Sequence, residues 1–124
     1  MSLISLDFSE IIDGKVQNKK VEFSCFLLKK PYNLESLFVT KVDGKSMEPV
    51  ISDKGLVVSD LSQNVFENNQ IFLVYYENKM WIKQSKIIDD KEYFVSINKD
   101  FSHLIYEKDE VRVIAKVLLT FRNF

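Results

Sequence analysis

The chain has 124 residues, the size of one domain with a single hydrophobic core. Hydrophobic residues make up 46% of it, with ten Phe and five Tyr against three Gly and two Pro, which is typical of a globular protein rather than a disordered one. Seventeen basic and eighteen acidic side chains leave a formal charge of −1. This balance argues against a nucleic-acid-binding face on this segment, because phosphate contacts need clustered Lys and Arg.

Most segments alternate apolar and polar residues and are rich in Val, Ile, Phe and Tyr, which favours strands over helices. We therefore predict a mostly β fold. In chain order, the expected strands are residues 2–8, 20–28, 37–42, 56–59, 70–76, 80–88, 93–97 and 111–121.

The first part of the chain, residues 1–30, is less regular than the rest, and we treat it as an N-terminal strand followed by a loop-like segment. A polar stretch with one glycine, residues 13–18, is expected to be a solvated loop. Residues 31–124 form the expected core of what is one structural domain overall. Polar turns are predicted at residues 77–79 and 89–91.

The last predicted strand, from Val111 to Phe121, has one wholly apolar face. A long strand at the end of a chain is either central in its sheet or an edge that pairs with another copy. We expect a homodimer formed through this strand.

A single cysteine, Cys25, excludes an intrachain disulfide and a metal site built from several cysteines. We predict neither a metal nor another cofactor. The chain also has no apolar run long enough to span a membrane and no signal peptide. We therefore expect a cytoplasmic protein that does not act at a membrane.

Two segments together indicate chemistry: the loop Gly44-Lys45-Ser46-Met47-Glu48-Pro49 and, later, Lys83 in an apolar strand. A serine hydroxyl becomes a nucleophile when a neighbouring base takes its proton, and a lysine is such a base once burial keeps it neutral. Trp81 shares a strand face with Lys83 and would help to exclude water. On spacing alone, a turn serine and a solvated lysine remain the simpler interpretation.

Residues 42–60 closely resemble the nucleophile segment of the LexA-like peptidases, the family of LexA, the phage repressors and UmuD. The family pattern is a Gly-x-Ser-Met loop, often followed by Pro, then an Asp-Gly turn and an apolar strand ending in Asp. Matching positions are Gly44, Ser46, Met47, Pro49 and Asp60. Lys83 falls in an apolar strand after a hairpin, where the family has its lysine. The resemblance implies a β-ribbon domain with strongly bent sheets and short helical turns, as in LexA and signal peptidase.

By this resemblance, Ser46 attacks a peptide carbonyl, Lys83 acts as general base and then acid, and the backbone N–H groups of Lys45 and Ser46 hold the oxyanion. The implied function is the C-terminal regulatory domain of a LexA-like or phage-repressor-like transcriptional regulator that cleaves itself in a DNA-damage (SOS) response. The family's substrate is usually its own N-terminal loop, and the RecA filament commonly stimulates cleavage. Any contact with DNA would require a domain outside this chain.

Two positions depart from the family pattern. The equivalent of the family's Ala-Gly or Cys-Gly scissile bond is Asp13-Gly14, and an Asp beside Lys83 would raise the lysine pKa that has to fall. The Asp-Gly turn is replaced by Asp53-Lys54-Gly55, for which we expect a shifted turn. Three hypotheses follow: a self-cleaving domain or UmuD-like damage-response protein, a catalytically weak dimerisation and partner-binding module, and, least supported, a signal-peptidase relative.

Overall fold

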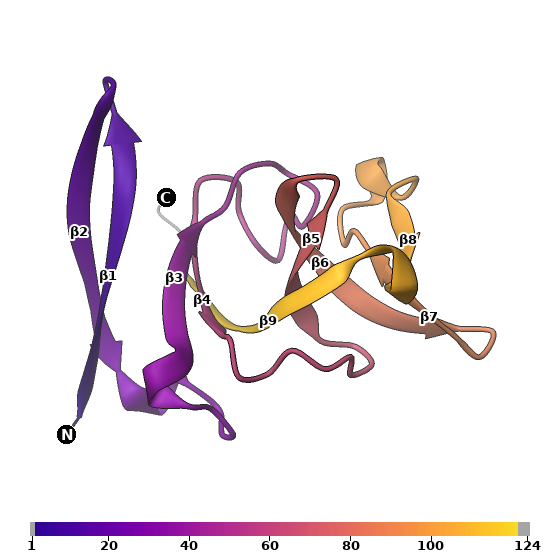
Figure 1. Ribbon diagram of the computed structural model, residues 1–124, viewed down its shortest axis with the longest axis horizontal. Coiled ribbons are helices and arrows are strands. Elements are labelled where there is room, and N and C mark those ends of the chain that lie inside the picture. Colours follow the sequence, from indigo (N-terminus) through magenta and orange to yellow (C-terminus); the bar gives the residue numbers. More distant parts are fainter. Residues whose placement is uncertain (1, 122–124) are drawn as a thin grey trace.

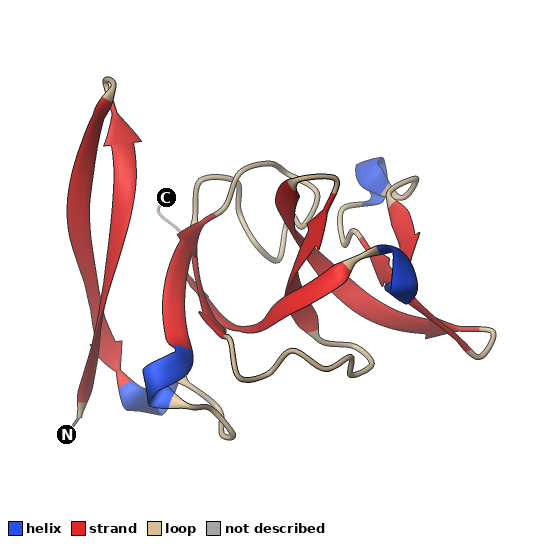
Figure 2. Ribbon diagram, in the orientation of Figure 1, coloured by secondary structure: helices blue, strands red, loops and turns tan. Residues whose placement is uncertain are grey.

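A computed structural model describes residues 2–121 (Figure 1). Within these residues the regular structure consists of nine strands and four 3-10 turns, with no α-helix, so the predicted mostly β fold is confirmed (Figure 2). The strands are β1 (Leu3–Ile12), β2 (Lys15–Ser24), β3 (Leu37–Lys41), β4 (Leu56–Asp60), β5 (Ile71–Tyr76), β6 (Lys79–Ile88), β7 (Lys91–Val95), β8 (Ile105–Glu107) and β9 (Arg112–Phe121). The 3-10 turns are η1 (Cys25–Leu27), η2 (Leu34–Ser36), η3 (Lys99–Phe101) and η4 (Lys108–Glu110). None of these described helical turns is long or apolar enough to cross a membrane.

The strands form two antiparallel sheets. Seven of them make one sheet in the order β3-β4-β9-β5-β6-β7-β8, and β1 and β2 make a separate two-stranded ribbon. Figure 1 shows the ribbon at one end of the molecule beside β3, with β7 and β8 at the other end. Register shifts interrupt the pairing of β9 with both β4 and β5, and such bulges bend and twist a sheet.

The C-terminal strand β9 is central, not an edge. It pairs with β4 through residues 116–121 and with β5 through residues 112–116. Of the two arrangements open to a long terminal strand, the central one is therefore found. The strand holds the two halves of the large sheet together.

Three hairpins close through two-residue turns whose residues all have positive φ. These turns are Asp13-Gly14, Glu77-Asn78 and Asp89-Asp90. Such turns match the right-handed twist of the flanking strands, and Gly, Asn and Asp adopt them at the lowest cost. The predicted turns after β5 and β6 are thus present, one residue shorter than expected in each case.

The N-terminal segment is more regular than the sequence predicts. Residues 15–18, expected in a polar loop, belong to β2, and β1 continues to Ile12. The prediction was wrong here because these residues are exposed and carry no apolar alternation. Pairing with β1, rather than burial, holds this part of β2 in an extended conformation.

The base of the ribbon packs on the large sheet. Ile4 and Phe23 are buried with Leu37 and Val58, and the Phe23 ring lies 5.6 Å from the ring of Phe121. A second core, beneath the loop between β3 and β4, is formed by buried apolar residues from that loop and from four strands of the sheet: Val42, Met47, Ile51, Val57, Leu73, Ile82 and Ala115. The loop that carries Ser46 is therefore anchored from below.

Candidate active site

The side chains of Ser46 and Lys83 meet, although 37 residues separate them in the chain. Ser46 lies on the loop between β3 and β4, and Lys83 is near the middle of β6. The Lys83 Nζ donates to the Ser46 Oγ at 3.0 Å. This distance is within the range expected for a nucleophile and its base.

Lys83 is fully buried, which is unusual for a lysine. It pairs with Phe72 on β5, and its Nζ lies 5.6 Å from the centre of the Trp81 ring. Desolvation by burial lowers the pKa of Lys83 from 10.5 to about 8. A substantial fraction of the amine is therefore neutral close to physiological pH, as a general base requires.

A second hydroxyl, which was not predicted from the sequence, holds the lysine. The Lys83 Nζ donates to the Oγ of Ser96, just after β7, at 2.9 Å. A neutral amine has two hydrogens and one lone pair. Once the amine has lost the proton that it donates to Ser46, continued donation to Ser96 leaves the lone pair to accept the hydroxyl proton of Ser46, so Ser96 orients the base.

The nucleophile loop is fixed by its carbonyl groups. The backbone N–H of Asn98 donates to the Ser46 carbonyl at 2.9 Å, and its side-chain Nδ2 donates to the Lys45 carbonyl at 2.8 Å. Within residues 2–121, neither the Lys45 nor the Ser46 backbone N–H donates a hydrogen bond. Both predicted oxyanion donors are therefore free of hydrogen bonds within the protein, and Asn98 holds the peptide unit that carries the Ser46 N–H through the Lys45 carbonyl.

The other motif residues support this loop in different ways. Met47 is 2% exposed and packs into the core beneath it, whereas Pro49 is exposed in the following turn. Gly44 adopts a φ of +114°, which L side chains rarely adopt, and its N–H donates to the Asp53 Oδ1 at 2.8 Å. Backbone geometry therefore favours glycine at position 44, and packing favours an apolar side chain at position 47.

A turn is present at Asp53-Lys54-Gly55, and its shift relative to the family stays a prediction. The residue with positive φ is Lys54, at +69°. Gly55 serves a different need, because a Cβ there would lie 2.7 Å from the carbonyl oxygen of Phe121 on β9.

A cavity of about 90 Å³ opens beside Ser46, with room for a group the size of a few water molecules. Its walls are mostly apolar and come from the end of β3, the nucleophile loop, β5 and the start of β6: Thr40, Lys41, Val42, Asp43, Gly44, Met47, Leu73, Met80, Trp81 and Ile82. This is the shape of a site that takes a small side chain next to the nucleophile. Among the described residues, no three His, Cys, Asp or Glu side chains are grouped so as to hold a metal.

The candidate scissile bond lies away from this cavity. Asp13 and Gly14 form the turn at the tip of the β1–β2 ribbon, and a Cβ on Gly14 would meet no atom within 4 Å. The structure therefore does not bring Asp13-Gly14 to Ser46. Cleavage of that bond would require the tip to unfold and move.

Asp60, the last motif residue, has a structural position at the end of β4. It is fully buried, and its carboxylate accepts hydrogen bonds from the Asn33 N–H, the Ser62 N–H and hydroxyl, and the Gln63 Nε2. Burial raises its pKa, but the hydrogen bonds from Gln63, Ser62 and Asn33 outweigh this effect and leave the pKa below 3.8. Asp60 therefore organises the chain around it and does not contact the Ser46–Lys83 pair.

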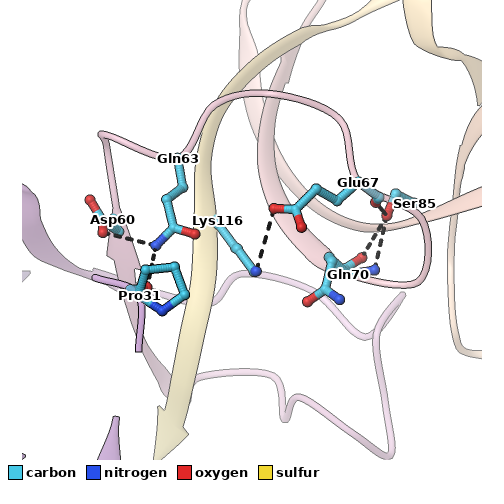
Figure 3. A network of polar contacts seen from close by, with 7 residues as sticks. All are labelled: Pro31, Asp60, Gln63, Glu67, Gln70, Ser85 and Lys116. Carbon is cyan, nitrogen blue, oxygen red and sulfur yellow. Dashed lines mark hydrogen bonds and ion pairs between the residues drawn. The ribbon is translucent and has the colours of Figure 1, made fainter. Parts of the chain in front are cut away.

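Figure 3 shows how Asp60 ties down the segment after β4. Gln63 bridges Asp60 and the carbonyl oxygen of Pro31, at 3.0 and 2.8 Å. Further along the same loop, Glu67 forms an ion pair with Lys116 at 3.6 Å, and its carbonyl accepts from Ser85. Ser85 lies on β6, two residues beyond Lys83, so this loop covers the strand that carries the buried lysine.

A comparison with protein families agrees with this geometry. The Peptidase S24-like family model matches residues 8–118, which include both Ser46 and Lys83. A comparison with curated proteins found no match.

Proposed function

The chain belongs to the Peptidase S24-like family, and on this premise we propose that it is a serine endopeptidase domain that cleaves a peptide bond of its own chain. The observation that carries the proposal is the 3.0 Å contact between the Lys83 Nζ and the Ser46 Oγ, with the amine buried. Burial lowers the pKa of Lys83 to about 8, and the hydrogen bond to Ser96 orients the amine. A solvated lysine would have neither property.

In the proposed reaction, the Ser46 Oγ attacks the carbonyl carbon of the scissile peptide while Lys83 takes the hydroxyl proton. The Lys45 and Ser46 N–H groups stabilise the negative charge that develops on the carbonyl oxygen. Lys83 then gives its proton to the leaving amine, and an ester to Ser46 remains. A water molecule, deprotonated by Lys83, hydrolyses this ester and restores the serine.

The wider role is also a proposal. The resemblance to LexA, the phage repressors and UmuD supports a regulatory domain of a transcriptional regulator or a DNA-damage-response protein, with the RecA filament as a stimulating partner and DNA bound by a domain outside this chain. Homodimerisation through β9 is part of the same proposal. Although β9 is central in the sheet, its pairing with β5 ends at Lys116, so residues 117–121 have no strand partner on that side within the described residues. The free Cys25 fits a reducing cytoplasm.

The direct test is incubation of the purified chain at about pH 9.5, above the Lys83 pKa of about 8. We expect a slow break between Asp13 and Gly14, detected as two fragments by mass spectrometry. Ser46→Ala and Lys83→Ala should leave the chain intact. An unmodified chain that stays whole at this pH contradicts self-cleavage.

A second candidate, the catalytically weak dimerisation and partner-binding module, is favoured by the position of Asp13-Gly14 in a closed turn outside the cavity. It predicts that Ser46→Ala changes neither the dimer dissociation constant nor gene control by the full-length regulator. The peptidase proposal predicts that Ser46→Ala prevents the full-length regulator from releasing its control of the gene. A reporter-gene assay that compares the unmodified and the Ser46→Ala regulator separates these outcomes.

A further inference from the structure

We propose that Asp53 is a positioning residue for Ser46, an inference that rests on the proposed peptidase function. Asp53 follows the nucleophile loop, and its Oδ1 accepts the backbone N–H of Gly44, nine residues earlier, at 2.8 Å. This hydrogen bond joins the two ends of the loop that presents Ser46. Asp53 contacts neither Ser46 nor Lys83, so any effect on the reaction passes through the loop.

Gly44 needs such a restraint because of its conformation. At a φ of +114° it lies outside any strand or helix, and glycine is the residue with the largest backbone freedom to lose. A hydrogen bond from an N–H to a carboxylate is roughly twice as strong as one between neutral groups. A carboxylate at position 53 is therefore well suited to hold this peptide.

Asp53 is itself held from two sides. Its backbone N–H donates to the Glu48 Oε2 at 3.2 Å, which ties it to the middle of the loop. Directly after it, the Lys54 N–H donates to the Val42 carbonyl at 2.9 Å, and the Val42 N–H donates to the Gly55 carbonyl at 2.8 Å. These hydrogen bonds join the two ends of the loop, so the backbone that carries the Asp53 carboxylate is held in place.

Two restraints then act on the segment from Gly44 to Ser46. Asp53 fixes its entry through the Gly44 N–H, and Asn98 fixes its exit through the Lys45 and Ser46 carbonyls. The peptide units between them carry the proposed oxyanion donors. Lys83, by contrast, is held by β6 and Ser96, independently of Asp53. Loss of Asp53 should therefore disorder the donors and the nucleophile while the base keeps its environment.

The test compares Asp53→Ala, Asp53→Asn and, as a control in the same turn, Ser52→Ala. The rate of self-cleavage, in which each chain is cut once, is measured as a function of pH. We expect Asp53→Ala to lower the plateau rate by about ten- to a hundredfold, as expected when a charge-assisted hydrogen bond that orients reacting groups is lost. The midpoint of the pH profile should stay near 8, because the burial of Lys83 is unchanged. Asp53→Asn keeps an acceptor oxygen and should recover part of the rate, and Ser52→Ala should match the unmodified chain.

A second measurement does not depend on activity. In a Ser46→Ala background, amide hydrogen exchange of Gly44 should be protected and should become faster on Asp53→Ala but not on Ser52→Ala. Unchanged Gly44 exchange contradicts the hydrogen bond. If Asp53→Ala cleaves at the unchanged rate, Asp53 has no role in the reaction. If its rate falls together with a shifted pH midpoint and a lower melting temperature, the substitution has loosened the whole fold, which also contradicts the positioning role. Failure of the unmodified chain to cleave, with Gly44 exchange as expected, refutes the proposed function and with it the catalytic role of Asp53.

Discussion

At the scale of single residues, Lys83 illustrates a conflict between stability and chemistry. Its pKa is about 8 in the folded chain and near 10.5 when exposed, so between these pH values the unfolded chain binds more protons than the folded one. Stability should therefore rise as the pH increases from about 8 to 10.5. Below this window, the folded chain bears the full cost of a buried ammonium.

Lys83→Met should consequently stabilise the fold at pH 7, by about 1–2 kcal/mol after allowing for the two lost hydrogen bonds. The gain should shrink as the pH rises from about 8 through 10.5, above which the lysine is neutral in both states. Denaturant unfolding of both proteins at the two pH values measures it. A Met variant that is less stable at pH 7, or a difference that does not change with pH, would contradict the burial argument.

Ser96 should act on the base rather than on the substrate. Its Oγ accepts from the Lys83 Nζ, and a hydrogen bond to the charged form favours that form. Ser96→Ala should therefore shift the midpoint of the pH–rate profile to lower pH, and it should also lower the plateau rate by about tenfold because the lone pair is no longer aimed at Ser46. Ser96→Thr keeps the hydroxyl and should restore both values. If Ser96→Ala moves neither value, the orienting role is wrong.

The same residues show which parts of the site the sequence makes visible. Ser46 and Lys83 were predicted because the Gly-x-Ser-Met loop and the later lysine resemble the LexA-like peptidases, whereas the local pattern alone favoured a turn serine and a solvated lysine. Ser96, Asn98 and Asp53 reach the site through the fold, and a serine or asparagine outside a motif carries no local sign of its partner. Asp60 is the opposite case, because it belongs to the motif but organises the neighbouring chain instead of the reaction.

At the scale of elements, six of the seven strands of the large sheet were predicted, and each of these six has at least one buried residue. The short strand β8 was not predicted, and none of its residues is buried. The boundaries of β3, β4, β5, β6 and β9 lie within one residue of those expected. The distal half of the ribbon was not predictable, because β2 from Lys15 to Lys20 is exposed along its whole length. Its register is set by the turn and by pairing with β1, neither of which produces an apolar pattern.

This ribbon is fastened to the rim of the cavity by one carboxylate. The Glu10 side chain is only 12% exposed and forms ion pairs with Lys19 across the ribbon at 2.7 Å and with Lys41 at the end of β3 at 3.0 Å. Hydrogen bonds from Lys19 and Lys41 lower the Glu10 pKa. Lys41 also lines the cavity, and Glu10 lies three residues before Asp13.

Weakening this contact should free the ribbon tip to move towards Ser46. Glu10→Gln should therefore speed self-cleavage by about two- to fivefold, the modest effect expected when an ion pair near the surface is lost. Glu22→Gln, on the exposed face of the same ribbon, serves as the control. The test is to measure the cleavage rates of the two variants and of the unmodified chain at equal pH and ionic strength. If Glu10→Gln cleaves more slowly than the unmodified chain, the Glu10 ion pairs assist cleavage instead.

At the scale of the whole molecule, cutting between Asp13 and Gly14 would not by itself release the N-terminal piece. Strand β1 would remain paired with β2 over its full length, and Ile4 would remain buried with Phe23 against Leu37 and Val58. The ribbon base is thus part of the sheet's core, not an appendage to it. Cleavage would cut the tip of the ribbon and leave this packing in place.

This can be tested without any peptidase activity by mixing a peptide of residues 2–13 with a separately produced chain of residues 14–124. We expect a stable one-to-one complex whose melting temperature rises with peptide concentration, because the peptide restores a strand and a buried side chain. An Ile4→Ala peptide should bind at least about tenfold more weakly, since truncating a buried Ile costs about 2–5 kcal/mol, whereas Ser5→Ala, on the exposed face of β1, should bind normally. Equal binding of the Ile4→Ala and unmodified peptides, or no binding of either, would show that Ile4 does not hold β1 in place. In that case, cleavage at the tip would shed the strand and expose the core beneath it.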